Sequence, residues 1–195
     1  MSWVIEATAS GTYELPPSGT HGGVLIGLID LGIQWVEYGD QPGKLTPQIC
    51  LVWQLPDSDG KELVSKVYTK SLNQKAGLRK LISGWRGKDL SDAEKFDISK
   101  LVGQKCVLSI SHQSKGEKTS YKIESVSAVP KGMTISKPDH EPVLVSVGGD
   151  IPEWMPKIYG KTIQEYWDKI NDAPDHHEGN GKAAAAKTTD DEIPF

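Results

Sequence analysis

The chain has 195 residues and a formal net charge of −4, and its length fits one domain with appendages. No apolar run is long enough for a membrane-spanning helix, and the first residues lack the charged-then-apolar pattern of a secretory leader. Cys50 and Cys106 lie far apart in apolar runs, a pattern typical of reduced, buried thiols. We therefore expect a cytoplasmic protein with no membrane partner.

The charges are distributed unevenly along the chain. Residues 1–150 contain 17 Lys or Arg and 17 Asp or Glu, whereas residues 151–195 contain 5 and 9, which gives the whole −4. Within the neutral body, residues 61–88 contain eight basic residues and a single acid, Glu62. This pattern indicates a nucleic-acid-binding protein with a separate recruiting end. The alternative is that these basic residues are ordinary solvated charges.

The first predicted elements are an irregular segment and a long strand. Residues 1–23 are rich in Gly, Ser, Thr and Pro, which predicts an irregular N-terminal segment. From Val24 to Tyr38 the apolar residues recur with a period of two, as in a β-strand. The run is long for a strand, and we expect a β-bulge or sharp bend at Gly27 or Gly32.

Two further strands and a helix follow. Alternation predicts strands at residues 49–55 and 62–69, separated by a turn at residues 56–60. Over residues 71–87 the apolar side chains recur at three- and four-residue steps, which predicts an amphipathic helix with Ser71 as its N-cap.

Strands at residues 105–112 and 120–129 complete the predicted body. Three strands, a helix and two more strands match the OB-fold, a mainly β, five-stranded, partly open Greek-key barrel, here with the helix inserted between strands 3 and 4. A β-sandwich, which needs about seven strands, ranks second. We assign residues 24–150 to an OB-fold domain.

The C-terminal part divides into three segments. Residues 151–170 contain regularly spaced apolar side chains and predict short helices that dock on the barrel. Residues 171–189 are polar and predict a flexible linker, because too little is apolar to offset the cost of ordering. Residues 190–195 form an acidic, partner-recruiting tip.

The tip is Asp190, Asp191, Glu192, Ile193, Pro194 and Phe195. An aromatic ring beside the terminal carboxylate can enter an apolar pocket while the acids meet a basic rim. The tip resembles the C-terminal tip of bacterial single-stranded DNA-binding proteins, which recruits replication and repair enzymes. The alternative is an acidic tail that only aids solubility.

The body also resembles a known group. The segments LIDLGIQWVEYGDQPGK, ICLVWQLPDSDGKE and SKVYTKSLNQKAGLRKLISGWRGK, followed by FDISKLVGQKCVLSISHQ and IPEWMPKI, resemble phage proteins assigned to single-stranded DNA binding on an OB-fold. This resemblance covers roughly residues 20–165 and implies a location in the bacterial host cell. The body does not resemble the tetrameric bacterial protein whose tip it shares, which leaves open whether the chain is a homo-oligomer.

A single-strand binder of this type needs aromatic rings for base stacking and cations for phosphates. Trp53 and Trp85 share apolar faces and are interpreted as core. Tyr121 is a weaker candidate. We predict the DNA-binding residues to be Trp35, Tyr38, Lys66, Tyr68, Lys70, Lys75, Arg79, Arg86 and Lys88.

Patterns for catalysis or metal binding are poor. The histidines lack cysteine partners at zinc-site spacing, and no nucleophile–base pattern stands out. We therefore expect no enzyme, no catalytic residue, no metal and no cofactor. The predicted function is sequence-independent protection of single-stranded DNA with recruitment of replication, recombination or repair proteins. The alternative is a protein-binding adaptor that mimics the tip to engage host DNA-repair enzymes.

Overall fold

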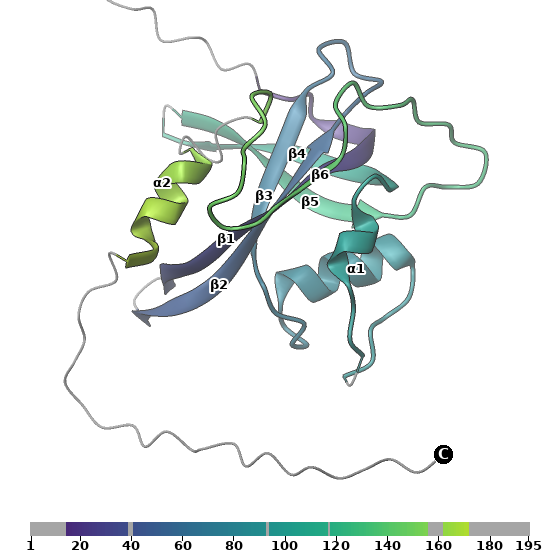
Figure 1. Cartoon of the computed structure of the whole chain (residues 1–195). Helices are drawn as coiled ribbons and strands as arrows, with labels where there is room; N and C mark the ends of the chain where they lie inside the picture. Colours follow the sequence, from purple (N-terminus) through teal and green to yellow (C-terminus); the bar gives the residue numbers. More distant parts are fainter. Residues whose placement is uncertain (1–14, 39–40, 93, 117, 156–161, 172–195) are drawn as a thin grey trace, which may run out of the picture.

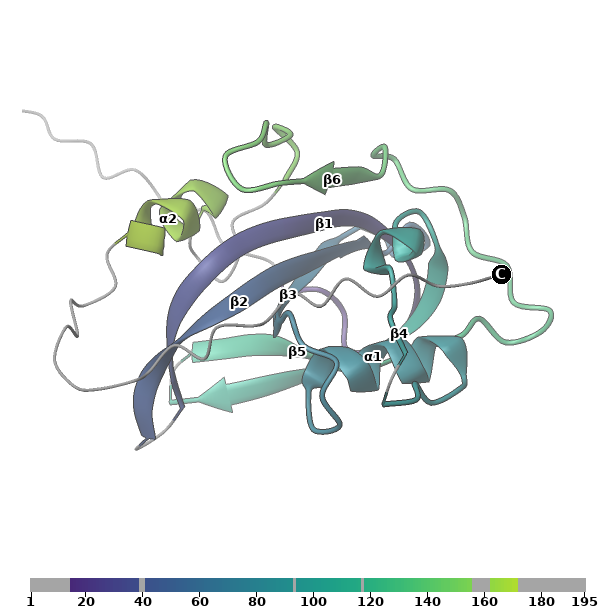
Figure 2. The ribbon, with the colours of Figure 1, turned by 60° about the horizontal axis from the view of Figure 1, so that its bottom comes forward.

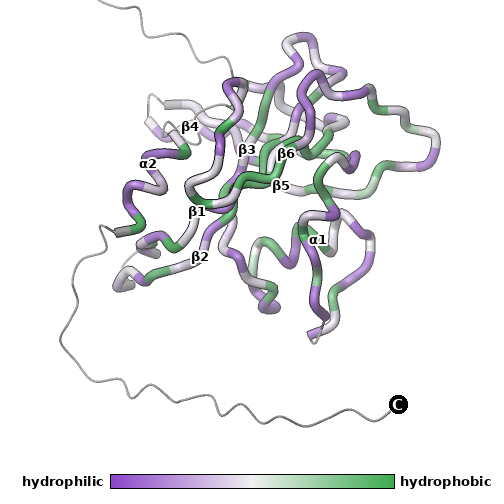
Figure 3. Tube along the Cα trace, in the orientation of Figure 1, coloured by the Kyte–Doolittle hydropathy of each residue, from purple (hydrophilic) through white to green (hydrophobic). Residues whose placement is uncertain are grey.

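The computed structural model describes residues 15–38, 41–92, 94–116, 118–155 and 162–171 (Figure 1). These residues form a mainly β structure with a six-stranded sheet and two α-helices, which confirms the predicted class. Figure 3 shows that the apolar parts of the chain are concentrated in the strands. No helix within these described ranges is long and apolar enough to cross a membrane.

The strands pair in the order β3-β2-β1-β4-β5, with β6 added in parallel to β1 and every other pair antiparallel. Their bounds are β1 Gly19–Tyr38, β2 Gln41–Gln54, β3 Leu63–Thr69, β4 Lys105–Lys115, β5 Lys118–Ser127 and β6 Val143–Val145. No strand pairing joins β3 to β5 in the described part of the sheet. The sheet is therefore open along this seam.

The prediction that residues 1–23 are irregular is wrong at its C-terminal end, because β1 already begins at Gly19. Residues Gly19–Val24 pair with β4. A Cβ atom at Gly22 would lie 2.8 Å from the Ile135 side chain, and one at Gly23 would lie 2.6 Å from Leu108. These glycines are close-packing positions within a strand, whereas their sequence pattern suggested breaks.

The length of β1 is accommodated by irregularities in its pairing with β2. Register shifts lie between Leu25 and Gly27 and between Asp30 and Gly32, at the two glycines where a bulge was predicted. Gly32 has a φ of 70°, a left-handed conformation that glycine adopts without the steric cost of a Cβ.

The helix α1 (Gly77–Arg86) begins after Ala76, later than the Ser71 N-cap that the sequence predicted. It ends at Gly87, whose φ is 63°. A 3-10 helix, η1 (Ile98–Leu101), precedes β4. Near the C-terminal end, α2 (Ile163–Asp168) begins with a capping box and continues into η2 (Lys169–Asn171).

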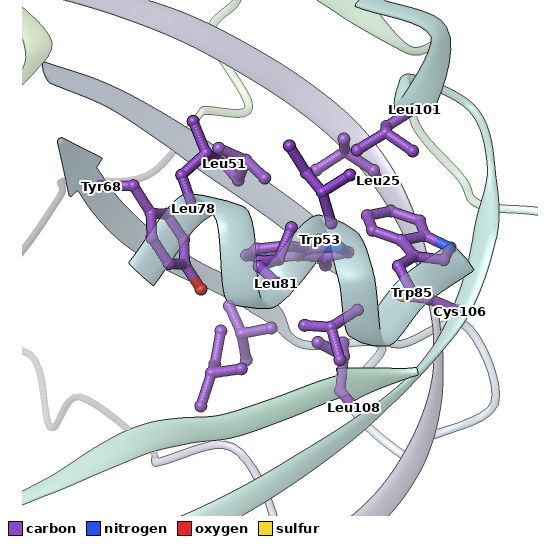
Figure 4. Packing of buried hydrophobic residues seen from close by; sticks show 14 of the residues in the cluster. Leu25, Leu51, Trp53, Tyr68, Leu78, Leu81, Trp85, Leu101, Cys106 and Leu108 are labelled. Carbon is purple, nitrogen blue, oxygen red and sulfur yellow. The ribbon is translucent and has the colours of Figure 1, made fainter. Parts of the chain in front are cut away.

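Two apolar cores lie on the two faces of the sheet. The first lies between the sheet and α1, where Trp53, fully buried, sits 6.5 Å from Trp85 between ring centroids (Figure 4). The second lies under residues 130–155 and α2, whose Trp167 side chain is buried. The Trp167 Nε1 donates to the Asp30 carbonyl at 2.9 Å, which fastens α2 to β1.

Candidate nucleic-acid interface

A cleft with a volume of about 990 Å³ opens between β3, the start of α1 and β5. Figure 2 shows α1 lying alongside β5. The cleft follows the seam that lacks a strand pairing, so two of its walls are the β3 and β5 sheet edges and the third is α1. Its lining side chains that carry charge are Lys44, Lys66, Lys75, Lys80 and Glu124.

The cleft has an excess of positive charge. Its one lining acid, Glu124, is held by Lys122 at 2.8 Å and accepts a hydrogen bond from Ser111 at 2.7 Å. The Lys122 ammonium and then the Ser111 hydroxyl hold the pKa of Glu124 below its ordinary value. Because Lys122 balances that carboxylate, the lysines of the cleft determine its charge, and this charge suits a polyanion.

Side chains join the two edges of the seam. The Tyr121 hydroxyl accepts from the Ser65 N–H at 2.9 Å and donates to the Ser65 carbonyl at 3.2 Å. One residue along β3, the Lys66 Nζ donates to the Ile123 carbonyl of β5 at 2.7 Å. These three hydrogen bonds fix the separation of the cleft walls.

Lys66 is a predicted phosphate contact that lies in the cleft. Partial burial, and then the nearby Lys122 charge, lower the pKa of its ammonium. An ammonium has three donors, and one of them is directed to Ile123. A phosphate at this point would improve the environment of the charge, because it would offset both the burial and the Lys122 repulsion.

Tyr68 does not have its predicted role as a stacking platform. Its side chain is only 8% exposed and belongs to the first core, and Figure 4 shows it beside Leu78 of α1. The sequence placed Tyr68 on the face of Lys66, which suggested an exposed face. In the structure this face of β3 packs against the first core. Lys66 lies on the same face, and its long aliphatic stem carries the ammonium out to solvent.

The side chain of Arg79, another predicted phosphate contact, is engaged by partners within the protein. The Arg79 guanidinium donates to the Asp92 carboxylate at 2.8 Å, to the Leu72 carbonyl at 3.2 Å and to the Leu90 carbonyl. Its side chain is only 15% exposed. Arg79 thus ties the segments on either side of α1 to the helix.

Arg86 likewise holds the loop that follows α1. Its guanidinium contacts the Glu94 carboxylate at 2.6 Å and lies 5.4 Å from the centre of the Phe96 ring. Arg86 stays a predicted phosphate contact, and in the structure its guanidinium is paired with Glu94. Both partners come after the basic segment in the sequence, and only the fold of this loop brings them back to the helix.

The remaining predicted lysines lie in three places. Lys70, at the end of β3, pairs with Asp30 at 2.9 Å. Lys75 lines the cleft, and Lys88 lines a separate hollow on α1. Lys44 and Lys80 were not among the predicted contacts; Lys80 lies in the basic segment, whereas Lys44 stands alone in the sequence and joins the cleft only through the sheet.

Trp35 lies on a two-stranded extension of the sheet, which we call the arm (residues 33–38 and 41–47). The strand β3 pairs with β2 only as far as Gln48, so the arm projects beyond it. Trp35 pairs with Leu45 in register, and a Cβ atom at Gly43 would lie 2.5 Å from the Trp35 ring. The indole therefore packs closely on the Gly43 backbone.

The face of the arm that carries Trp35 is exposed and mainly apolar, and it also carries Glu37, whose carboxylate accepts a hydrogen bond from the Trp35 Nε1 at 3.4 Å. Ile33 is 50% exposed and Leu45 is 53% exposed, and Pro47 is exposed beside them. The backbone of Tyr38 ends β1, but its side chain is outside the described part of the structure.

The predicted tip, residues 190–195, also lies outside the described residues, as do residues 172–189 of the predicted linker. Within the described ranges, no group of three or more His, Cys, Asp or Glu side chains is arranged to hold a metal ion. No family model matches the chain, and no curated protein matches it. The cleft and the arm are therefore the features of the described residues that bear on function.

Proposed function

We propose that this chain binds single-stranded DNA without strong sequence preference and recruits replication, recombination or repair proteins through residues 190–195. The observation that carries the proposal is the lysine-lined cleft beside an arm with an exposed apolar face. A binding groove of this kind combines cations that follow the backbone with flat side chains that receive bases.

The proposed fold is an OB-type, partly open Greek-key barrel. Three features support it: the strand order β3-β2-β1-β4-β5, the position of α1 between β3 and β4, and the β3–β5 seam bridged by Tyr121 and Lys66. In barrels of this type the ligand lies across strands 2 and 3 and the loops beside them. The arm is the β1–β2 end beside this surface, and β3 forms one wall of the cleft.

In the proposed complex, phosphates contact the ammonium groups of Lys44, Lys66, Lys75 and Lys80. Bases stack on Trp35 and contact Ile33 and Leu45. Stacking contributes roughly 1–3 kcal/mol per base, and every base has a face that can stack. Binding of this kind is independent of sequence and depends on salt.

The recruiting role of the tip is proposed from its residues alone. Burial of Ile193 and Phe195 in a partner would contribute roughly 1.5–3 kcal/mol each. Exposed charge pairs with the three acids would add about 0–1 kcal/mol each and make recruitment salt-sensitive. Many copies coating one strand would present many tips, which raises the effective affinity for a partner with several sites.

The test is a titration of the full chain with oligo-dT at several salt concentrations, in which tryptophan fluorescence reports binding. We expect quenching and a log–log salt slope of about −0.7 for each phosphate contacted. The double variant Lys44→Gln, Lys75→Gln should make the slope shallower by about 1.4. The matched control, Lys131→Gln with Lys137→Gln, changes two exposed lysines outside the cleft and should leave the slope unchanged.

The competing proposal is the protein-binding adaptor, and two observations favour it. Tyr68 is buried, and the guanidinium groups of Arg79 and Arg86 are paired with acids, which leaves fewer DNA contacts than the sequence predicted. An adaptor would show no fluorescence change with oligo-dT at any salt concentration, and its binding to repair enzymes would still require Phe195.

A further inference from the structure

A second hollow lies on the outer side of α1, with a volume of about 410 Å³. Its lining includes Arg79, Lys80, Gly84, Gly87, Lys88 and Asp89. Two of these residues, Lys80 and Gly84, also line the main cleft. The two hollows therefore meet across α1 at these residues.

At Gly84, where the two hollows meet, no side chain projects from the surface of α1. Gly84 is exposed and has no side chain, and the helix is held close to β5 there, since a Cβ atom would lie 2.7 Å from the Val126 carbonyl oxygen. Three residues further on, Gly87 has open space where a side chain would be. At Gly84 the β5 backbone occupies the space that a side chain would need, and the exposed Gly84 backbone forms the surface that the two hollows share.

The charges of the second hollow favour an anion. Lys80 and Lys88 are exposed, and the Arg79 charge is matched by Asp92, which leaves Asp89 as the opposing acid among the lining residues. The carbonyl end of a helix repels anions, but here the Gly87 and Lys88 N–H groups donate to the Gly84 and Ser83 carbonyls. Capping of this kind satisfies these two carbonyls near the end of the helix.

We propose that the second hollow is a continuation of the DNA site: the strand leaves the cleft, crosses α1 at Gly84 and places a phosphate against Lys88. This inference rests on the proposed function and deepens it. The hollow extends the binding site by several nucleotides, and Lys88 contacts only strands long enough to reach it.

The experiment compares a short and a long probe on the full-length chain. The probes are oligo-dT of about 5 and about 15 nucleotides, within the range that one OB-type domain covers. Lys88→Gln should leave the affinity for the short probe unchanged and make the salt slope for the long probe shallower by about 0.7. Asp89→Asn should strengthen binding of the long probe only.

The controls separate failure of this inference from failure of the proposed function. Lys131→Gln removes an exposed lysine outside both hollows. It should change neither the affinity nor the salt slope for either probe. If the unaltered protein binds both probes but Lys88→Gln changes neither, or weakens both equally, the path across α1 is wrong. If the unaltered protein binds neither probe, the proposed function itself is wrong. Circular dichroism spectra of the three variants should match that of the unaltered protein, since Lys88, Asp89 and Lys131 are all exposed.

Discussion

The seam between β3 and β5 gives the most direct test of how the cleft is built. Tyr121→Phe removes one hydroxyl and nothing else. That hydroxyl satisfies both the N–H and the carbonyl of Ser65, at 2.9 and 3.2 Å, and Ser65 is only 4% exposed. An unsatisfied buried polar group costs about 1–3 kcal/mol. Tyr121 is half-buried, and water entering beside the ring would restore part of this, so we expect a loss of about 2 kcal/mol in the free energy of unfolding.

The assay is urea unfolding of the full chain, monitored by tryptophan fluorescence. A loss of about 2 kcal/mol should lower the transition midpoint without changing its slope on denaturant concentration. In thermal unfolding the same loss corresponds to roughly 4–8 °C. Ser127→Ala, at an exposed position of the same strand, is the control and should change stability by less than about 0.5 kcal/mol. A Tyr121→Phe effect no larger than this control would refute the role of the hydroxyl in joining the seam.

Three further outcomes follow from the structure. Tyr68→Ala should lower the free energy of unfolding by about 3–5 kcal/mol in urea, as expected for a large core side chain; retention of full stability would show that the ring is not core. Trp35→Ala should instead reduce oligo-dT affinity by about 1–3 kcal/mol in fluorescence anisotropy; unchanged affinity would remove Trp35 from the site. Although partial burial alone would raise the pKa of Asp30, hydrogen bonds from Lys70 and from a backbone N–H lower it overall. The stability that Asp30 contributes is therefore complete above about pH 5 and is lost as pH falls below about 4. Between about pH 5 and about pH 3 the free energy of unfolding of Asp30→Asn should change less with pH than that of the unaltered chain. An equal change in both proteins would contradict this.

The order of elements was predictable because strong local patterns produced it. The helix α1 follows from apolar residues at helical spacing, and Leu78, Leu81, Ile82 and Trp85 are all buried in it. Its first turn was predicted too early, because Ser71 is a good capping residue by type whereas the observed N-cap, Ala76, makes no side-chain cap hydrogen bond. The packing of the helix on the sheet therefore determines where α1 begins, and the capping preference of Ser71 does not.

The N-terminal part of β1 was unpredictable for a different reason. Gly22 and Gly23 break a local pattern, but they pair with β4, which is distant in the sequence. Their value to the fold is the space they leave for Ile135 and Leu108. Only the folded neighbours reveal that a side chain at these positions would collide.

The sequence predicted the basic segment that supplies the candidate site. It did not predict which of the basic residues line the cleft, because that depends on which of them pair with acids in the fold. The basic segment supplies Lys66, Lys75 and Lys80 to the cleft, but it also supplies Arg79 and Arg86, which hold the loop after α1. A count of charges cannot separate the two groups, because the acids that pair with the arginines come later in the chain. Arginine is the better residue for fixed, multiply bonded pairing. Lysine keeps a mobile point charge on a flexible stem, which suits contacts with a backbone of varying conformation.

This division of labour explains why the cleft remains positive in a chain with an overall negative charge. The arginines and their acids cancel within the loop, and the Lys122–Glu124 pair cancels on β5. The cleft lysines lie on strands β2 and β3, in the loop before α1 and on α1 itself, and Glu124 is the one acid among the residues that line the cleft. A groove that binds a strand by many weak, similar contacts would need this arrangement, because affinity then grows with the number of phosphates engaged. Removal of any one lysine should accordingly weaken binding in proportion to its single contact, and no single substitution in the cleft should abolish it.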